Sequence, residues 1–374
     1  MRGRILVWLL MLGGALLLFA PKVYAAQEEP EETWQAQMEA LPLEGVDDVL
    51  EKEGVSFSAI LDSIAQGNWR GTTEMKTGLR AVFSAMSSQK ELFRELFFLA
   101  AASALLAQTE GATKRAPLGV MVCSLALTAL VLASFYTSAH LVAQTVGHME
   151  ELLSQMLPVY LTLMAMSGQI TQTAALAPAV MGGSFFVTKI VREIVVPAVG
   201  FGVCIAFVNA LSPRQTFGAL ARLCRQGTSW ALKGVSLAFM AVLGLMKLGT
   251  SGMDGALGQT AKAAVGAVPI VGDILTGSVE AAGSISALLR HSAMVGVAVA
   301  LFFVVLLPVL QVGAVMLLYK VAAALLEPIA EKRIISSLES AGDFTALLLG
   351  ALFVCVLAFW FGAGLLLTVV GEGG

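Results

Sequence analysis

The chain has 374 residues, of which 57% are hydrophobic and 13% are charged, whereas about a quarter of the residues in an average soluble domain are charged. The net charge of -3 and the nearly uncharged central part argue against a nucleic-acid-binding protein. Residues 92 to 371 form a series of apolar runs, several of them at least about eighteen residues long, which is enough for a helix to cross a bilayer. The composition therefore predicts an all-α, polytopic helical membrane protein.

Residues 1–26 are predicted to be a signal peptide. Two arginines precede a short apolar run, and small residues allow cleavage after Ala25 or Ala26. The alternative is an uncleaved first membrane helix. We favour cleavage because the apolar run is short for a span, and in both cases the next segment is expected outside the cytoplasm.

Residues 27–90 are predicted to be a small acidic, extracytoplasmic helical region with 12 acidic and 5 basic residues. Apolar residues recur at helical spacing after Ser56, a candidate N-cap, and again in a second helix around residues 75–86. These helices need an apolar surface. Packing on the membrane body or the headgroups is one interpretation, and a docking face for another extracytoplasmic protein is the other.

Residues 91–374 are predicted to be the multispan membrane body. Windowed hydropathy predicts about eight spans, with six to eight compatible with the pattern. The predicted spans are 92–108, 117–142, 152–167, 171–188, 195–211, 230–250, 293–320 and 344–370. The third and fourth are short and polar, and a single re-entrant pair is an alternative there. The run from 293 to 326 contains Pro308 and is too short for two crossings, which favours one kinked helix.

The charges in the loops test this topology. With the N-terminal region outside, three basic loops fall on the cytoplasmic side, in agreement with the positive-inside rule. Their basic residues are Lys114 and Arg115, then Arg214, Arg222 and Arg225, then Lys332 and Arg333. Lys189 and Arg192 fall outside, which is a local violation.

A glycine-rich segment at 250–292 is predicted to be an amphipathic hairpin, because its apolar stretch is too short to span and contains Pro269. One interpretation is a pore-lining or partner-binding hairpin. The other is a hairpin with solvated charges. Its candidate functional residues are Lys262, Asp273, Glu280 and Arg290.

Lys320 is a further candidate for pore or partner contact, together with Glu327 seven residues later, close to the same helical face. A lysine near the end of a span usually reaches to the headgroups. Pairing with Glu327 or with another helix of the bundle is the alternative.

No catalytic, cofactor-binding or metal site is predicted, and the chain is not expected to be an enzyme. His148 lacks the second histidine of a metalloprotease helix, and there is no phosphate-binding glycine-lysine loop. The four cysteines lack metal-ligand spacing.

The order and spacing of several short stretches resemble the stage III sporulation protein AE family of endospore-forming bacteria, over essentially the whole chain. The stretches are Val55-Ser56-Phe57, the residues from Leu157-Pro158 to Pro178, Thr260-Ala261-Lys262, Pro269-Ile270-Val271-Gly272 and the run from Tyr319 to Pro328. After Pro328 the chain departs from the family, because it has Ala330-Glu331-Lys332-Arg333 where the family tends to have a small, glycine-rich link.

The resemblance implies a component of the channel between mother cell and forespore, in the mother-cell membrane, with its N-terminal region facing the intermembrane space. The implied partners are other stage III sporulation A-type proteins, including an ATPase and ring-forming proteins, and a forespore membrane protein. Two functions remain open: a membrane platform or export gate that seats partner proteins, or a permease that moves a small molecule.

Overall fold

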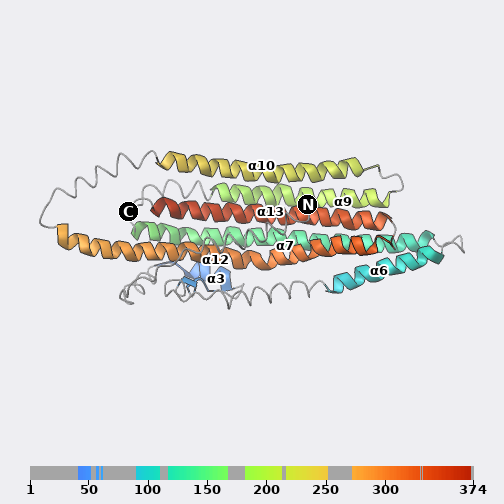
Figure 1. Cartoon of the computed structure of the whole chain (residues 1–374), viewed down its shortest axis with the longest axis horizontal. Helices are drawn as coiled ribbons and strands as arrows, with labels where there is room; N and C mark the ends of the chain where they lie inside the picture. Colours follow the sequence, from blue (N-terminus) through green and yellow to red (C-terminus); the bar gives the residue numbers. More distant parts are fainter. Residues whose placement is uncertain are drawn as a thin grey trace.

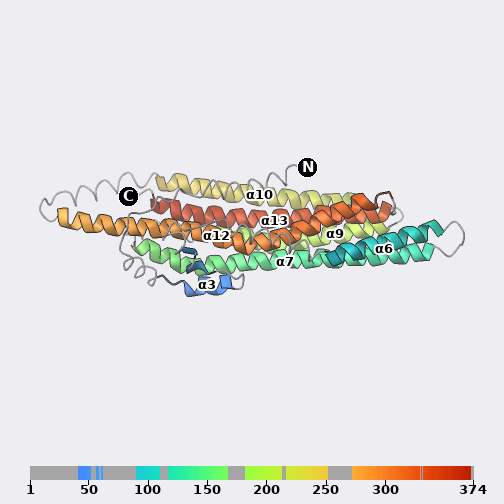
Figure 2. The same cartoon turned by 60° about the horizontal axis from the view of Figure 1, so that its bottom comes forward.

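The computed structural model describes residues 41–51, 56–58, 60–61, 90–109, 117–166, 182–212, 216–251, 272–328, 330 and 332–371. Every secondary-structure element in these ranges is a helix, as the sequence predicts. The long helices lie side by side in an elongated bundle, in which long helices that follow one another in the chain run in opposite directions (Figures 1 and 2). A shorter helix, α3, lies on the outside of the bundle.

The helices have the following bounds. They are α3 (Glu44–Glu51), α6 (Lys90–Thr109), α7 (Pro117–Met166), a helix over 182–190 that continues through a π-helical turn η1 (Val191–Val195) into α9 (Val196–Leu211), α10 (Gly218–Ser251), α12 (Gly272–Leu326) and α13 (Lys332–Gly371).

Four helices in the described part of the chain are long and apolar enough to cross a membrane. They cover Met121–Val159, Gly182–Leu211, Val299–Leu326 and Lys332–Gly362. The predicted count of about eight spans is not confirmed. Predicted spans 117–142 and 152–167 are both parts of α7, and predicted spans 171–188 and 195–211 meet within the continuous run Gly182–Leu211.

Pro308 lies inside α12, so the run around it forms one helix, as expected. Residues 272–292, the second half of the predicted glycine-rich hairpin, form the beginning of this helix. Residues 252–271 lie outside the described part of the chain. At 1.5 Å per residue, the 55 residues of α12 measure roughly 80 Å, so this helix is far longer than the hydrocarbon core of a bilayer is thick.

The π-turn in the run Gly182–Leu211 has a cause in the sequence. Pro197 has no N–H to donate to the carbonyl of residue 193, and its ring would crowd that carbonyl in a regular α-helix. The chain widens the turn instead, and the N–H of Val196 bonds to the carbonyl of Val191, five residues back. This accommodates the proline without ending the helix.

The wider turn also serves packing. A row of five valines, each at most 2% exposed, lies at intervals of four residues along this run: Val187, Val191, Val195, Val199 and Val203. On a regular α-helix, positions four apart rotate by about 40° at each step, so such a row would leave the core after a few steps. The extra residue in the π-turn opposes that drift and keeps the row facing the bundle.

The described residues between 41 and 61 pack on the outside of α7 and α12. Asp47 of α3 caps the next helical segment, because its Oδ1 accepts the backbone N–H of Phe57 at 2.5 Å and the hydroxyl of Ser56 at 3.1 Å. Phe57 is fully buried and lies 3.0 Å from where a Cβ on Gly296 of α12 would stand. These residues therefore pack their apolar side chains on the helical body of the protein.

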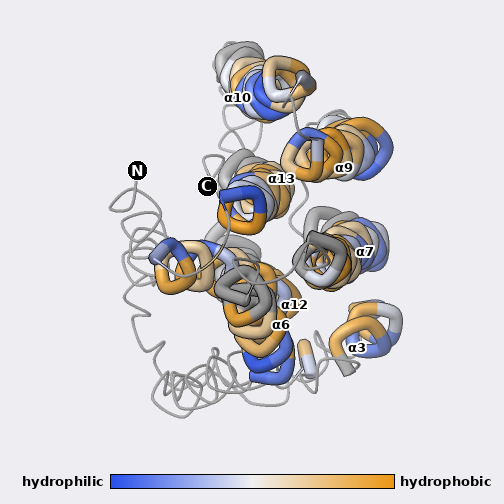
Figure 3. Tube along the Cα trace, turned by 90° about the vertical axis from the view of Figure 1, so that its right-hand side faces the viewer, coloured by the Kyte–Doolittle hydropathy of each residue, from blue (hydrophilic) through white to orange (hydrophobic). Residues whose placement is uncertain are grey.

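The three connections with the basic loops share one end of the bundle (Figure 1). At this end, called the basic end below, α6 passes into α7, α9 into α10, and α12 into α13. The other end carries the ends of α7 and α10, the start of α12 and the C-terminal part of α13 (Figure 1). Seen along the bundle, α10 lies at an edge, beside α9 and α13 (Figure 3).

Candidate functional site

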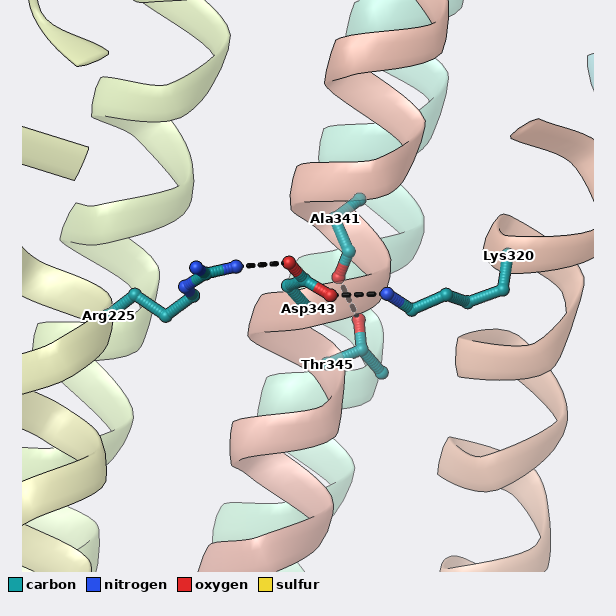
Figure 4. Close-up of polar contacts among 5 residues, drawn as sticks. All are labelled: Arg225, Lys320, Ala341, Asp343 and Thr345. Carbon is teal, nitrogen blue, oxygen red and sulfur yellow. Dashed lines mark hydrogen bonds and ion pairs between the residues drawn. The ribbon is translucent and has the colours of Figure 1, made fainter. Parts of the chain in front are cut away.

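Three charged side chains from three helices meet within the bundle. Asp343 of α13 stands between Arg225 of α10 and Lys320 of α12 (Figure 4). Its Oδ2 accepts a hydrogen bond from Arg225 Nη1 and its Oδ1 accepts one from Lys320 Nζ. We call these three residues the charge cluster. One carboxylate is shared by two cations, so the cluster carries one net positive charge.

The backbone beside Asp343 makes room for this arrangement. Carbon atoms of the Lys320 side chain lie 3.2 Å from where a Cβ on Gly342 would stand. Because glycine has no side chain, the stem of Lys320 lies directly against α13 and its ammonium reaches the carboxylate. The hydroxyl of Thr345, two residues after Asp343, donates to the carbonyl of Ala341 one turn back in the same helix, at 2.8 Å (Figure 4).

The position of the charge cluster along α12 and α13 is as informative as its contacts. Lys320 follows an uncharged segment, 293–319, and Asp343 precedes another, 344–371. Ionisable residues in or beside such segments are costly and usually functional. The side chains of Arg225, Lys320 and Asp343 are 44%, 42% and 32% exposed, so each member of the charge cluster remains partly accessible.

A second polar group lies farther along the bundle from the basic end. The Glu150 carboxylate of α7 accepts the hydroxyl of Thr188 and lies 3.7 Å from the guanidinium of Arg192 in the π-turn. Thr188 is fully buried, and Glu150 is 26% exposed. This group ties α7 to the π-turn by charge as well as by packing.

A groove of about 530 Å³ runs between α10 and α13. Apolar lining comes from Leu232, Leu237 and Met240 on α10 and from Leu347, Gly350 and Val354 on α13. Ser229, Lys233 and Ser236 add polar groups on the α10 side. The groove lies at the edge of the bundle, where α10 flanks α13 (Figure 3).

The residues singled out in the sequence have different outcomes. Lys262 lies outside the described residues. Asp273, Glu280 and Arg290 lie on the first part of α12, where the structure describes the backbone but not these side chains. Lys320 pairs with Asp343 on a neighbouring helix, while Glu327 is exposed in the turn after α12.

Sequence reasoning missed the partners that complete both polar groups. Of the two polar groups, only Lys320 was among the predicted site residues. Asp343, Arg225, Glu150, Thr188 and Arg192 were not. A signal existed for Asp343, because it is the last charged residue before the uncharged segment of α13. Nothing in the sequence pairs Glu150 with Thr188 and Arg192, since the contact depends on how α7 packs against the π-turn.

The four long apolar helices of the described part are typical of a helical membrane protein. The family model of stage III sporulation protein AE matches residues 55–369, so the chain belongs to the stage III sporulation protein AE family. The stage III sporulation protein AE of Bacillus subtilis (strain 168) is similar, with 24% identity over 244 residues. That alignment covers 65% of this chain and 61% of the relative. No solved structure matches the chain.

The family resemblance read from the sequence is thus confirmed. The family description names a sporulation protein and not an enzyme. In the described part of the chain, no group of three or more His, Cys, Asp or Glu residues is suited to hold a metal ion.

Proposed function

We propose that this protein is the polytopic membrane component of a sporulation transenvelope channel, acting as a platform or export gate that seats other channel proteins. It would reside in the mother-cell membrane around the forespore, with the N-terminal region in the intermembrane space. Its partners would be other stage III sporulation A-type proteins, including the ATPase and the ring-forming proteins, and a forespore membrane protein. Family membership supports the sporulation role, and one feature of the surface supports the platform.

The observation that carries the platform is a stripe along the exposed side of α10, called the edge stripe. Its members recur at intervals of four and three residues, and large and small side chains alternate over the first six of them. They are Leu223, Gly227, Trp230, Gly234, Leu237, Ala241 and Gly244. Trp230 and Leu237 are both 74% exposed.

The glycines of the edge stripe distinguish it from an ordinary lipid-facing helix surface. Exposed leucine and tryptophan are expected against lipid, so they alone indicate nothing. A four-three repeat of large and small residues is typical of helix pairs that interlock, because glycine lets two backbones approach closely. Among the described residues, nothing lies within 4 Å of where a Cβ would stand on Gly227, Gly234 or Gly244. The edge stripe thus has room for a partner's membrane helix.

The alternative function is a permease for a small molecule. Glu150, Thr188 and Arg192 favour it, because they gather polar groups beside a π-turn, and irregular helices often mark transport sites. The groove between α10 and α13, in contrast, lies at the edge of the bundle and not at its centre.

Co-purification from sporulating cells tests the proposal. Tagged full-length protein would be recovered and its partners identified by mass spectrometry. We expect the sporulation ATPase and ring-forming proteins to accompany it. Replacing both Gly227 and Gly234 by leucine fills the open positions between the large side chains of the edge stripe. The recovery of partner proteins should then fall about tenfold, which corresponds to a loss of about 1.4 kcal/mol in binding free energy.

Gly313→Leu is the matched control, because Gly313 is also a helical glycine with nothing described within 4 Å of its Cβ position, and it lies on α12. The control should retain the partners. Recovery of well-folded protein alone would reject the platform and make the permease the function to test.

A further inference from the structure

The groove between α10 and α13 continues from the charge cluster. Asp343 contacts Arg225, and Gly350 lies beside Leu232, with a Cδ1 of Leu232 3.9 Å from where its Cβ would stand. Both pairs are 118 positions apart in the chain, so the two helices run parallel in a constant register. One turn after the ion pair, Ser229 and Leu347 begin the lining of the groove.

The groove has the shape and surface of a site for a hydrocarbon chain. Asp343, Leu347, Gly350 and Val354 recur at intervals of four, three and four, so they lie on one face of α13. The three after Asp343 are uncharged and line the groove. Its volume of about 530 Å³ is within the usual range for small-molecule sites. Because Gly350 has no side chain, nothing extends from that position of α13 into the groove.

The polar end of the groove is positively charged. The charge cluster has one net positive charge. Exposed Lys233 lies about two turns farther along α10 in the groove wall and adds another, which its flexible stem can direct back toward the cluster. Arg225 uses one of its five N–H donors for the bond to Asp343. Lys320 uses one of the three N–H donors of its ammonium group for its own bond to Asp343. Donors therefore remain for a second anion without loss of the ion pairs.

Along the helices a group of cations is followed by an apolar groove, just as the charged headgroup of a phospholipid is followed by its acyl chains. The cations stand where the uncharged segment of α13 begins, and the apolar groove follows that segment. Basic pockets between membrane helices bind anionic headgroups. We infer that this groove binds an anionic phospholipid, with its phosphate at Arg225 and Lys320, near Lys233, and one acyl chain against Leu347, Gly350 and Val354.

The proposed lipid site does not rest on the channel role, and its test uses the purified full-length protein. Stripped of lipid in a mild detergent, the protein is titrated with phosphatidylglycerol, with phosphatidylcholine and with inorganic phosphate, and bound lipid and thermal stability are measured. We expect phosphatidylglycerol to bind and to raise the melting temperature. Neither phosphatidylcholine nor phosphate alone should do so at the same concentration.

Two variants locate the binding. Gly350→Leu fills the groove where the nearest neighbour of a Cβ is at ordinary contact distance, and Lys233→Ala removes one cation that belongs to none of the described ion pairs. Lys233→Ala should weaken phosphatidylglycerol binding about fivefold, since a cation at the headgroup contributes a factor of that order. Gly350→Leu should also weaken it, because the leucine side chain would occupy the space assigned to the acyl chain. Lys189→Ala, an exposed lysine of the 182–190 helix, is the matched control and should bind as the wild type does.

Several outcomes would overturn the inference. Equal binding of phosphatidylcholine would mean that charge does not select the ligand. An equal effect of inorganic phosphate would reduce the site to a free-anion site. Unchanged binding in Lys233→Ala would exclude this groove even if Gly350→Leu failed to fold.

Discussion

Asp343 is the residue on which the contacts among α10, α12 and α13 converge. Its two carboxylate oxygens each accept from a different helix, so one side chain links three elements. Partly exposed ion pairs contribute little when isolated, about 0.2–1 kcal/mol each. Here the greater effect of losing Asp343 is the repulsion left between Arg225 and Lys320, which are held at the same level of the bundle.

We therefore predict that Asp343→Asn lowers the free energy of unfolding by roughly 1–2 kcal/mol, more than an exposed pair and less than a buried one. Combining it with Lys320→Met should restore part of the loss, because the second change removes the repulsion. Thermal unfolding in detergent measures both, as a double-mutant cycle. Strictly additive effects of the two changes would contradict the shared-carboxylate arrangement.

At the scale of elements, glycine has two opposite uses in this bundle. Gly202 of α9 lies where three helices come together: a Cβ there would stand 2.5 Å from Phe344 Cε1 and 3.2 Å from Cys224 Cβ. At Gly313 of α12, nothing described lies within 4 Å of the same position. The first glycine permits close packing, while the second only lowers helix propensity.

Alanine substitutions at these two glycines should therefore have different effects on the free energy of unfolding. Gly202→Ala is expected to lower the free energy of unfolding by roughly 1–3 kcal/mol, because overpacking forces Phe344 or the backbone to move. Gly313→Ala should leave it unchanged or raise it by up to about 1 kcal/mol, since alanine favours the helix. Chemical or thermal denaturation of the two purified variants decides this, and similar shifts for both would show that α9 does not pack as described.

For the molecule as a whole, the arrangement of ends leads to a topological prediction. The basic connections gather at one end of the bundle, and the C-terminal part of α13 points to the other (Figure 1). Basic residues flanking membrane helices are retained in the cytoplasm. The basic end is therefore expected on the cytoplasmic side and the C-terminus on the outer side.

This orientation can be measured by cysteine labelling after the four native cysteines are replaced. In intact non-sporulating cells that carry the protein in the cytoplasmic membrane, a membrane-impermeant thiol reagent should label a cysteine at Gly371 but not one at Thr216 or Glu327. Opening the membrane should expose the last two. Labelling of Thr216 and Glu327 before the membrane is opened would reverse the proposed orientation, and labelling of only one of them would contradict their shared end.

The two breaks between predicted spans explain why the predicted count of about eight spans is not confirmed in the described part of the chain. Hydropathy divides α7 near Glu150 and divides the run Gly182–Leu211 near Lys189 and Arg192, because polar residues there resemble loops. In the bundle these breaks face each other, since Glu150 contacts both Thr188 and Arg192. Their polar groups are satisfied across the helix pair, so neither helix needs to end.

The sequence by itself determined the class of fold and the family. Long uncharged segments can be stable only as helices in an apolar environment, and the order of the short family stretches is a property of the chain alone. Only the tertiary structure decided where helices continue and which charges meet. Lys320 with Asp343 and Arg225, the groove beside them and the exposed edge stripe all depend on which helices are neighbours and in what register. Hydropathy and periodicity describe one helix at a time, so they carry no information about that register.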